Sequence, residues 1–288
     1  MTLQDTVFCE NKIKQIFTPG ASPLVMGILN VTPDSFYDGG RYTSVDLWLE
    51  RAGKMMEEGV DIIDIGAYST RPGAEHISAE EESARLIEVV ESVKKNFPHV
   101  LISADTFRAG VAELAVAAGA HLINDISGGT MDKAMFTTIA NLNVPYVLMH
   151  IQGTPQTMQM QPQYKNVAKE VLAFFTQKKA ELNGLGVKKI ILDPGFGFGK
   201  LMEHNYRLLQ TLDDFHALQL PILVGFSRKS MVNKLLNIKA ADALNGTTVL
   251  NTIAIQKGAG ILRVHDVRQA KEVILITDYL KSNLTQRG

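Results

Sequence analysis

The sequence repeats one pattern eight times: a short run rich in valine, isoleucine and leucine ends in a polar residue or glycine, and a segment of helical character follows. The eight runs span residues 24–30, 60–65, 100–105, 120–125, 144–150, 189–193, 220–225 and 260–265. A short run that is apolar at most positions is typical of a strand buried on both faces. Because eight strand-helix units close into a barrel, we predict an α/β fold, the (β/α)8 TIM barrel.

The segments between the runs have helical spacing of apolar residues, for example Val45, Trp48, Ala52 and Met55. The alternative fold is an open doubly wound sheet, which would usually carry a glycine-rich dinucleotide loop after its first strand. That place holds Asn30-Val31-Thr32-Pro33-Asp34, which favours the barrel. We expect residues 1–288 to form a single domain. Residues 1–22 would be a short N-terminal extension, a hairpin or strand that plugs the bottom of the barrel.

The charge balance bears on the possible partners. Twenty-nine Lys and Arg residues balance thirty Asp and Glu residues, so no global basic field exists to hold nucleic acid or an anionic membrane. The start of the chain lacks a secretory signal, and no run of about 18 apolar residues occurs. We therefore expect a cytoplasmic protein. Cys9 is the only cysteine, which excludes an intrachain disulfide, and we interpret it as an incidental thiol in a polar segment.

Polar residues recur where the runs end, and barrel enzymes place their active sites at that rim. These residues are Asn30, Asp64, Asp105, Asn124, His150, Asp193, Ser227, Arg263 and His265. We interpret Asp64 as a helix cap. Asp105, Asn124 and Asp193 are expected to converge on the barrel axis and bind a ligand. For His150, pocket lining and catalysis both remain open.

Two strings at this rim suit ligand binding. Residues 193–200 contain three glycines, two phenylalanines and a lysine, a composition that lets backbone approach a ligand and aromatic rings cover a flat one. In residues 225–230, Ser227 is expected to cap a helix whose N-terminus attracts an anion beside two cations. A capped helix with solvated cations is the alternative interpretation of the second string.

The loops after the first two strands, residues 31–40 and 66–73, are long, polar and rich in proline and glycine. Such loops at the rim of a barrel are typical of lids or substrate loops. Arg71, Arg263 and His265 together could take a diphosphate, and Asn30 could add a neutral oxygen ligand for Mg²⁺. If the bound diphosphate orders both loops, a second substrate should bind well only after the first.

Six strings together resemble the dihydropteroate synthase family of folate biosynthesis. They are Met26-Gly27-Ile28-Leu29-Asn30-Val31-Thr32-Pro33-Asp34-Ser35-Phe36, Ser69-Thr70-Arg71-Pro72-Gly73-Ala74, Asn124-Asp125-Ile126-Ser127-Gly128-Gly129, Asp193-Pro194-Gly195-Phe196-Gly197-Phe198-Gly199-Lys200, Ser227-Arg228-Lys229-Ser230 and Arg263-Val264-His265-Asp266-Val267. They occur in the family's order and span residues 26–267. One departure is Gly66-Ala67-Tyr68, where the family commonly has Gly-Gly-Glu, so an acidic contribution from the second loop is not expected.

The resemblance implies a transferase that joins 6-hydroxymethyl-7,8-dihydropterin diphosphate to 4-aminobenzoate, with Mg²⁺ as cofactor. It assigns the pterin to Asp105, Asn124, Met149, Asp193, Phe198 and Lys229. It assigns the diphosphate to Asn30, Thr70, Arg71, Arg263 and His265, and the metal to Asn30. It assigns aminobenzoate to Phe36, Thr70, Pro72, Phe198, Ser227, Lys229 and Ser230. The catalytic set it implies is Asn30, Asp34, Arg71, Lys229, Arg263 and His265.

The resemblance also implies small-molecule substrates as partners, a homodimer, and competition by sulfonamides at the aminobenzoate site. The residue types agree with this chemistry, because a carboxylate, an amide and a cation complement the donors and acceptor on a pterin edge. Loss of diphosphate leaves a methylene cation that the ring stabilises, so no strong protein nucleophile is required.

Four other functions are compatible with parts of the sequence. A pterin-binding methyltransferase would keep counterparts of Asp105, Asn124 and Asp193, but it would not need Arg263-Val264-His265. A metal hydrolase is disfavoured because the first strand lacks paired histidines. An aldolase would use Lys229 as a Schiff base, although Lys229 lies beyond its strand. Only turnover distinguishes the enzyme from a non-catalytic folate-binding scaffold.

Overall fold

The computed structural model describes the whole chain except residues 1–2, 32–43, 70–75, 159, 161 and 285–288. All eight predicted strands are present, and every pairing between them is parallel. The strands are β1 (Leu24–Asn30), β2 (Ile62–Gly66), β3 (Leu101–Asp105), β4 (Leu122–Asp125), β5 (Tyr146–Met149), β6 (Ile190–Asp193), β7 (Leu223–Val224) and β8 (Ile261–Val264).

The sheet curls into a nearly closed barrel. Its strand order is β6-β5-β4-β3-β2-β1-β8-β7, so β1 pairs with both β2 and β8. A parallel bridge between Leu192 at β6 and Ile222 just before β7 joins the two ends of the sheet. The TIM-barrel prediction is confirmed, and the open doubly wound alternative is wrong because an open sheet would leave those ends unpaired.

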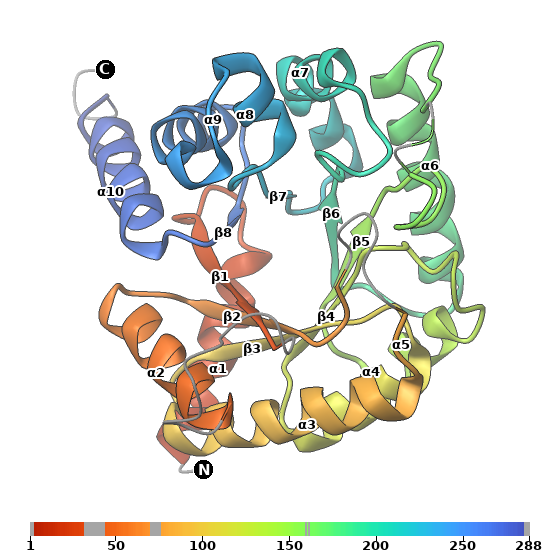
Figure 1. Ribbon diagram of the computed structural model, residues 1–288, viewed down its shortest axis with the longest axis vertical. Coiled ribbons are helices and arrows are strands. Elements are labelled where there is room, and N and C mark those ends of the chain that lie inside the picture. Colours follow the sequence, from red (N-terminus) through yellow and green to blue (C-terminus); the bar gives the residue numbers. More distant parts are fainter. Residues whose placement is uncertain (1–2, 32–43, 70–75, 159, 161, 285–288) are drawn as a thin grey trace.

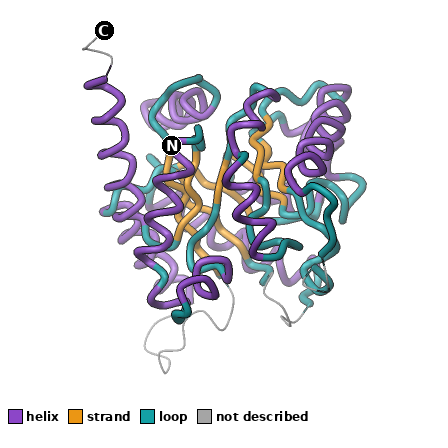
Figure 2. The backbone as a smooth tube through the Cα atoms, turned by 90° about the horizontal axis from the view of Figure 1, so that it is seen from above, coloured by secondary structure: helices purple, strands orange, loops and turns teal. Residues whose placement is uncertain are grey.

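Helices surround the barrel, as Figure 1 shows from one end and Figure 2 shows after a 90° turn. They are α1 (Leu3–Ile16), α2 (Ser44–Glu57), α3 (Ala79–Asn96), α4 (Ala109–Ala118), α5 (Met135–Leu142), α6 (Val167–Gly184), α7 (Met202–Gln210), α8 (Ser230–Leu236), α9 (Leu244–Gln256) and α10 (Val267–Leu284). Two short 3₁₀ helices, η2 (Leu212–Leu218) and η3 (Ala240–Asp242), lie in the connections. In the part of the chain described, no helix is long and apolar enough to cross a bilayer.

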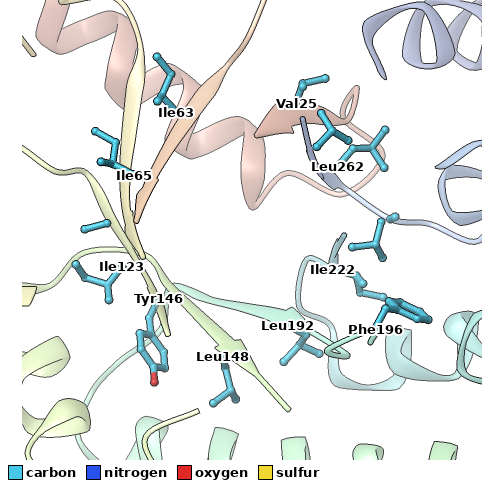
Figure 3. Close-up of a cluster of buried hydrophobic side chains, with 14 of the residues drawn as sticks. Val25, Ile63, Ile65, Ile123, Tyr146, Leu148, Leu192, Phe196, Ile222 and Leu262 are labelled. Atoms are coloured by element: carbon cyan, nitrogen blue, oxygen red, sulfur yellow. The ribbon is translucent and has the colours of Figure 1, made fainter. Parts of the chain in front are cut away.

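Two apolar layers hold the fold together, because successive side chains of a strand face opposite sides. The outward-facing residues pack between strands and helices, and Figure 3 labels ten of them, including Val25, Ile63 and Tyr146. The inward-facing residues fill the lower barrel. These are Leu24, Met26, Ile62, Leu101, Leu122, Val147, Ile191, Leu223 and Ile261.

The N-terminal extension is a helix, so the predicted hairpin or strand is wrong. The physical reason is the spacing of Cys9, Ile13, Ile16 and Phe17, which places all four on one helical face. That face packs on the lower barrel layer, so the expected plug is present in helical form. Cys9 is therefore a buried packing residue, and its thiol contacts the Pro98 carbonyl at 3.8 Å.

Candidate active site

A polar layer lies inside the barrel directly above the inward-facing apolar residues of the lower barrel. Most of its members follow one of these apolar residues by two positions on the same strand, so both side chains point into the barrel. Asp64 follows Ile62, Ser103 follows Leu101, Asn124 follows Leu122, Asp193 follows Ile191, and Arg263 follows Ile261. Asp105 continues the series at the end of β3. The predicted convergence of Asp105, Asn124 and Asp193 thus rests on strand geometry.

Arg263 joins three strands within this layer. Its Nε donates to Asp64 Oδ2 at 2.6 Å, and its Nη2 donates to Asp105 Oδ2 at 2.8 Å. Asn124 Nδ2 donates to the same Asp64 oxygen at 3.1 Å. The interpretation of Asp64 as a helix cap is wrong, because Asp64 lies inside β2 with its side chain fully buried in the barrel.

The two carboxylates beside Arg263 compete for one cation. Burial raises the pKa of Asp105 to about 8, and the charge of Asp64 adds to this, while Arg263 opposes it. For Arg263, burial alone would lower the pKa, but Asp64 and Asp105 outweigh it and raise the pKa. The pKa of Asp105 therefore lies above the usual range of an aspartate even though a cation is beside it.

Asp193 and Lys229 carry opposite charges in the site, and each influences the pKa of the other. Asp193 Oδ1 accepts from the Gly195 amide at 2.8 Å. Burial raises the Asp193 pKa, and Lys229 opposes the shift. Burial lowers the Lys229 pKa to about 8 against the pull of Asp193. Lys229 Nζ donates to the Phe196 carbonyl at 2.5 Å and lies 4.7 Å from the centre of the Phe198 ring.

The loop after β6 uses its glycines differently from the prediction. Gly195, Gly197 and Gly199 all have positive φ, and a Cβ on Gly195 would lie 2.0 Å from the His150 carbonyl oxygen. These glycines therefore allow the loop to pack closely on its own protein, a role that was not predicted for them. Phe196 is fully buried in the outer core, as Figure 3 shows, so only Phe198 faces the site.

An apolar wall borders the polar layer. The buried residues Phe107, Ile126 and Met149 cluster there, and Phe198 packs against them. Met149 and Phe198, which were both assigned to the pterin, therefore lie in the same apolar cluster. Phe107 and Ile126 were not predicted, although each follows a predicted pterin residue by two positions.

Ser227 and His265 meet at the end of β8. His265 Nδ1 lies 3.0 Å from Ser227 Oγ, and burial together with Arg263 lowers the His265 pKa to about 4, so the ring is neutral. Ser227 does not cap α8, which was the prediction. Arg228 has a φ of 59°, and this left-handed residue separates Ser227 from a helix that begins at Ser230 with Lys229 at the N-cap position.

Two further residues lie behind the site: Lys200, for which no role was predicted, and His150, for which pocket lining and catalysis were both left open. Lys200 is buried and donates to three backbone carbonyls of the rim. His150 is buried against Phe174, and its pKa falls to about 2 because of burial and Lys200. The His150 ring thus packs on Phe174, and its Nδ1 lies 3.0 Å from Lys200 Nζ.

The structure describes only some of the remaining predicted site residues. Asn30 ends β1 beside Gly66 and is half-buried, and Ser230 is exposed at the start of α8. Asp34, Phe36, Thr70, Arg71 and Pro72 lie outside the described residues, as do residues 32–40 of the first predicted lid loop and residues 70–73 of the second. Tyr68, which departs from the family pattern, binds His76 Nδ1 through its hydroxyl at 3.0 Å.

Comparisons with known proteins give one consistent result. Residues 26–265 match the family model described as pterin binding enzyme. The dihydropteroate synthase of Escherichia coli (strain K12) is 44% identical over 92% of this chain and 95% of its own length. The Yersinia pestis dihydropteroate synthase structure with a sulfonamide drug has 43% identity and a TM-score of 0.85, covering 91% of this chain and 95% of that one. The Xanthomonas albilineans enzyme in complex with 7,8-dihydropteroate has 35% identity and a TM-score of 0.81, covering 90% and 94%.

Proposed function

The chain belongs to the family of pterin-binding enzymes, and on that premise we propose the reaction of its dihydropteroate synthase relatives. The enzyme is a transferase that condenses 6-hydroxymethyl-7,8-dihydropterin diphosphate with 4-aminobenzoate, giving 7,8-dihydropteroate and diphosphate. The observation that carries the proposal is the polar layer at the barrel mouth beside the wall of Phe107, Met149 and Phe198.

The pterin ring fits this layer by its hydrogen-bonding pattern. A pterin edge offers ring N–H and amino donors next to a carbonyl acceptor. Asp193 accepts, Lys229 donates, and Asn124 can do either through its amide. The raised pKa of Asp105 favours a protonated carboxyl, which would donate to a ring nitrogen. The apolar wall gives the flat ring a surface to pack against, which places its methylene toward the rim.

The bond changes need positioning more than a protein nucleophile. The bond between the pterin methylene and the diphosphate oxygen breaks, and the diphosphate leaves with the electron pair. The ring stabilises the methylene cation, and the amine nitrogen of aminobenzoate then forms the new carbon–nitrogen bond and loses a proton. Asn30 and His265 lie at the rim where the departing charge develops, and preorganised donors there stabilise it.

Mg²⁺ is proposed as the cofactor, with Asn30 as its protein ligand. Among the described residues, no group of three or more His, Cys, Asp or Glu side chains could hold a metal ion. A single amide oxygen at the rim fits an ion that is held mainly by the substrate diphosphate and water. When bound, Mg²⁺ neutralises charge on the leaving diphosphate.

Aminobenzoate is assigned to the outer rim. Ser227, Lys229, Ser230 and Phe198 lie there in the described part of the chain, and Phe36, Thr70 and Pro72 are assigned to it by the resemblance. Its amine would approach the methylene from the side of the rim. Sulfonamides are proposed to compete for the same place.

A homodimer is proposed from the outer face of α10. Leu275, Ile276, Tyr279 and Leu280 share that face and are 53–71% exposed. An apolar stripe of this kind marks an interaction surface. Figure 1 shows α10 at the edge of the molecule next to α9, where a second copy could meet it. We further propose that the enzyme acts in the cytoplasm.

The turnover test is the release of diphosphate. With 6-hydroxymethyl-7,8-dihydropterin diphosphate, 4-aminobenzoate and Mg²⁺ together, diphosphate should appear continuously. Release from the pterin substrate alone would indicate a hydrolase, and absence of release with both substrates would leave a folate-binding scaffold.

A further inference from the structure

Lys200 ends the glycine-rich loop after β6, yet its ammonium group turns back into the protein. The side chain is buried, and Nζ donates to the carbonyl oxygens of His150 at 3.1 Å, Gly195 at 2.9 Å and Phe198 at 3.0 Å. His150 Nδ1 lies 3.0 Å from the same nitrogen. Four acceptors therefore surround the three N–H bonds of one ammonium group.

These contacts connect the loop to the neighbouring strand. His150 directly follows β5, whereas Gly195 and Phe198 belong to the loop after β6. Other contacts fix other parts of this loop, since the Gly197 amide donates to Asn205 Oδ1 at 2.7 Å and the Tyr164 hydroxyl donates to the Gly199 carbonyl at 2.8 Å. The carbonyl of Phe198 accepts its hydrogen bond from Lys200. Lys200 thus holds the inner side of a loop whose outer side carries Phe198.

Phe198 is the part of this loop that faces the proposed pterin. Its ring packs with Phe107, Ile126 and Met149 in the apolar wall, and Lys229 Nζ lies 4.7 Å from the ring centre. Its carbonyl is one of the three that Lys200 binds. A change at Lys200 would release this carbonyl, so the ring would lose its fixed place beside the pterin subsite.

We propose that Lys200 is a positioning residue for the pterin site and acts by fixing Phe198. This inference rests on the proposed function, since it requires a pterin that packs against Phe198. A lysine with a purely structural role would stabilise the fold without any energetic coupling to Phe198 in ligand binding.

The test is a double-mutant cycle on the affinity for bare 6-hydroxymethyl-7,8-dihydropterin, measured by calorimetry. Lys200→Met keeps the length of the side chain and removes its donors, and it should weaken binding by about tenfold or more. Phe198→Ala should weaken binding as well. In the Phe198→Ala background, Lys200→Met should lower the pterin affinity by less than about threefold, because the ring that Lys200 positions is no longer there.

Lys179→Met is the matched control. Lys179 also donates to a backbone carbonyl, that of Leu218 at 2.7 Å, but it lies on α6 away from the rim. Its pterin affinity should equal that of the unmodified enzyme. Circular dichroism and thermal unfolding of all variants report any loss of fold, and Lys200→Gln replaces Lys200→Met if the methionine variant does not fold.

Each outcome decides between the claims. If the unmodified enzyme fails to bind the pterin, the proposed function is wrong. If it binds and Lys200→Met binds equally well, the positioning role is wrong. Additive losses in the double variant would also overturn it, and so would failure of both Lys200 variants to fold, because Lys200 would then serve stability alone.

Discussion

Arg263 Nε lies 2.6 Å from Asp64 Oδ2, so a cation from the last strand and a carboxylate from the second meet inside the barrel. The same guanidinium also binds Asp105. One cation therefore serves two carboxylates in the barrel interior, and the pKa of Asp105 is raised by burial and by the charge of Asp64, although Arg263 opposes the shift.

The stability of the enzyme should depend on pH through Asp105. The ordinary pKa of this carboxyl, which applies to the unfolded chain, is 3.8, and the folded site raises it to about 8. The unfolded chain therefore loses this proton at lower pH than the folded protein does. The stabilising contribution of Asp105 is complete below pH 4 and is lost as the pH rises toward 8. Urea unfolding of Asp105→Asn should show a free energy of unfolding that increases, relative to the unmodified enzyme, between pH 5 and pH 8. A constant difference would mean that Asp105 titrates normally.

Asp193→Asn should weaken pterin binding strongly. The amide presents a donor to ring donors where the carboxylate accepted, and one such unpaired buried contact costs about 1–3 kcal/mol, or roughly 5- to 150-fold in affinity. Calorimetry with 6-hydroxymethyl-7,8-dihydropterin measures the effect. Unchanged affinity would remove Asp193 from the pterin subsite.

Asn30→Ala and His265→Ala should reduce turnover through the diphosphate and its metal. The binding of bare pterin should stay nearly unchanged in both variants, because neither side chain belongs to the polar layer beneath the ring. Steady-state kinetics and pterin calorimetry together separate the two effects. Loss of bare-pterin binding in either variant would place that residue in the pterin subsite instead.

Aminobenzoate should bind the free enzyme poorly and the pterin-loaded enzyme well. The expectation comes from the composition of residues 31–40 and 66–73, which supply much of the proposed aminobenzoate subsite. Assembly of a site by a first ligand typically corresponds to a coupling of about 1–3 kcal/mol. Titration of aminobenzoate with and without a pterin analogue and Mg²⁺-diphosphate measures it. Equal affinities would mean that the pocket is already formed in the free enzyme.

Ile276→Asp should convert the proposed dimer to a monomer. The new carboxylate would have to be desolvated at the centre of the apolar stripe on α10, which is unfavourable without a partner charge. Sedimentation analysis gives the masses of both proteins, and Glu272→Gln on the same helix is the control. A monomeric unmodified enzyme would exclude the dimer proposal.

The fold could be predicted because its signals are local. Apolar runs of strand length, repeated eight times, determine the number and order of the strands. The same local alternation explains why Asp105, Asn124 and Asp193 face one axis. The helix α1 carried a local signal too, since Cys9, Ile13 and Ile16 have helical spacing.

The remaining features depend on contacts between distant residues. Asp64 binds Asn124, 60 positions away, and Arg263, 199 positions away. Its role could not be predicted from neighbouring residues, because it depends on the closed barrel. Lys200 donates a hydrogen bond to the carbonyl of His150, which lies 50 positions earlier in the sequence. The failed cap at Ser227 has a different cause, because a positive φ at a residue such as Arg228 is uncommon and has no sequence signal here.

The central claim is that the polar layer of the barrel holds the pterin, and a crystal structure with 6-hydroxymethylpterin tests it most directly. The ring should lie at the barrel mouth, with its edge within hydrogen-bonding distance of Asn124 and Asp193 and its face against Phe198 and Met149. A ring bound outside the barrel, or one whose edge contacts neither Asn124 nor Asp193, would contradict the claim.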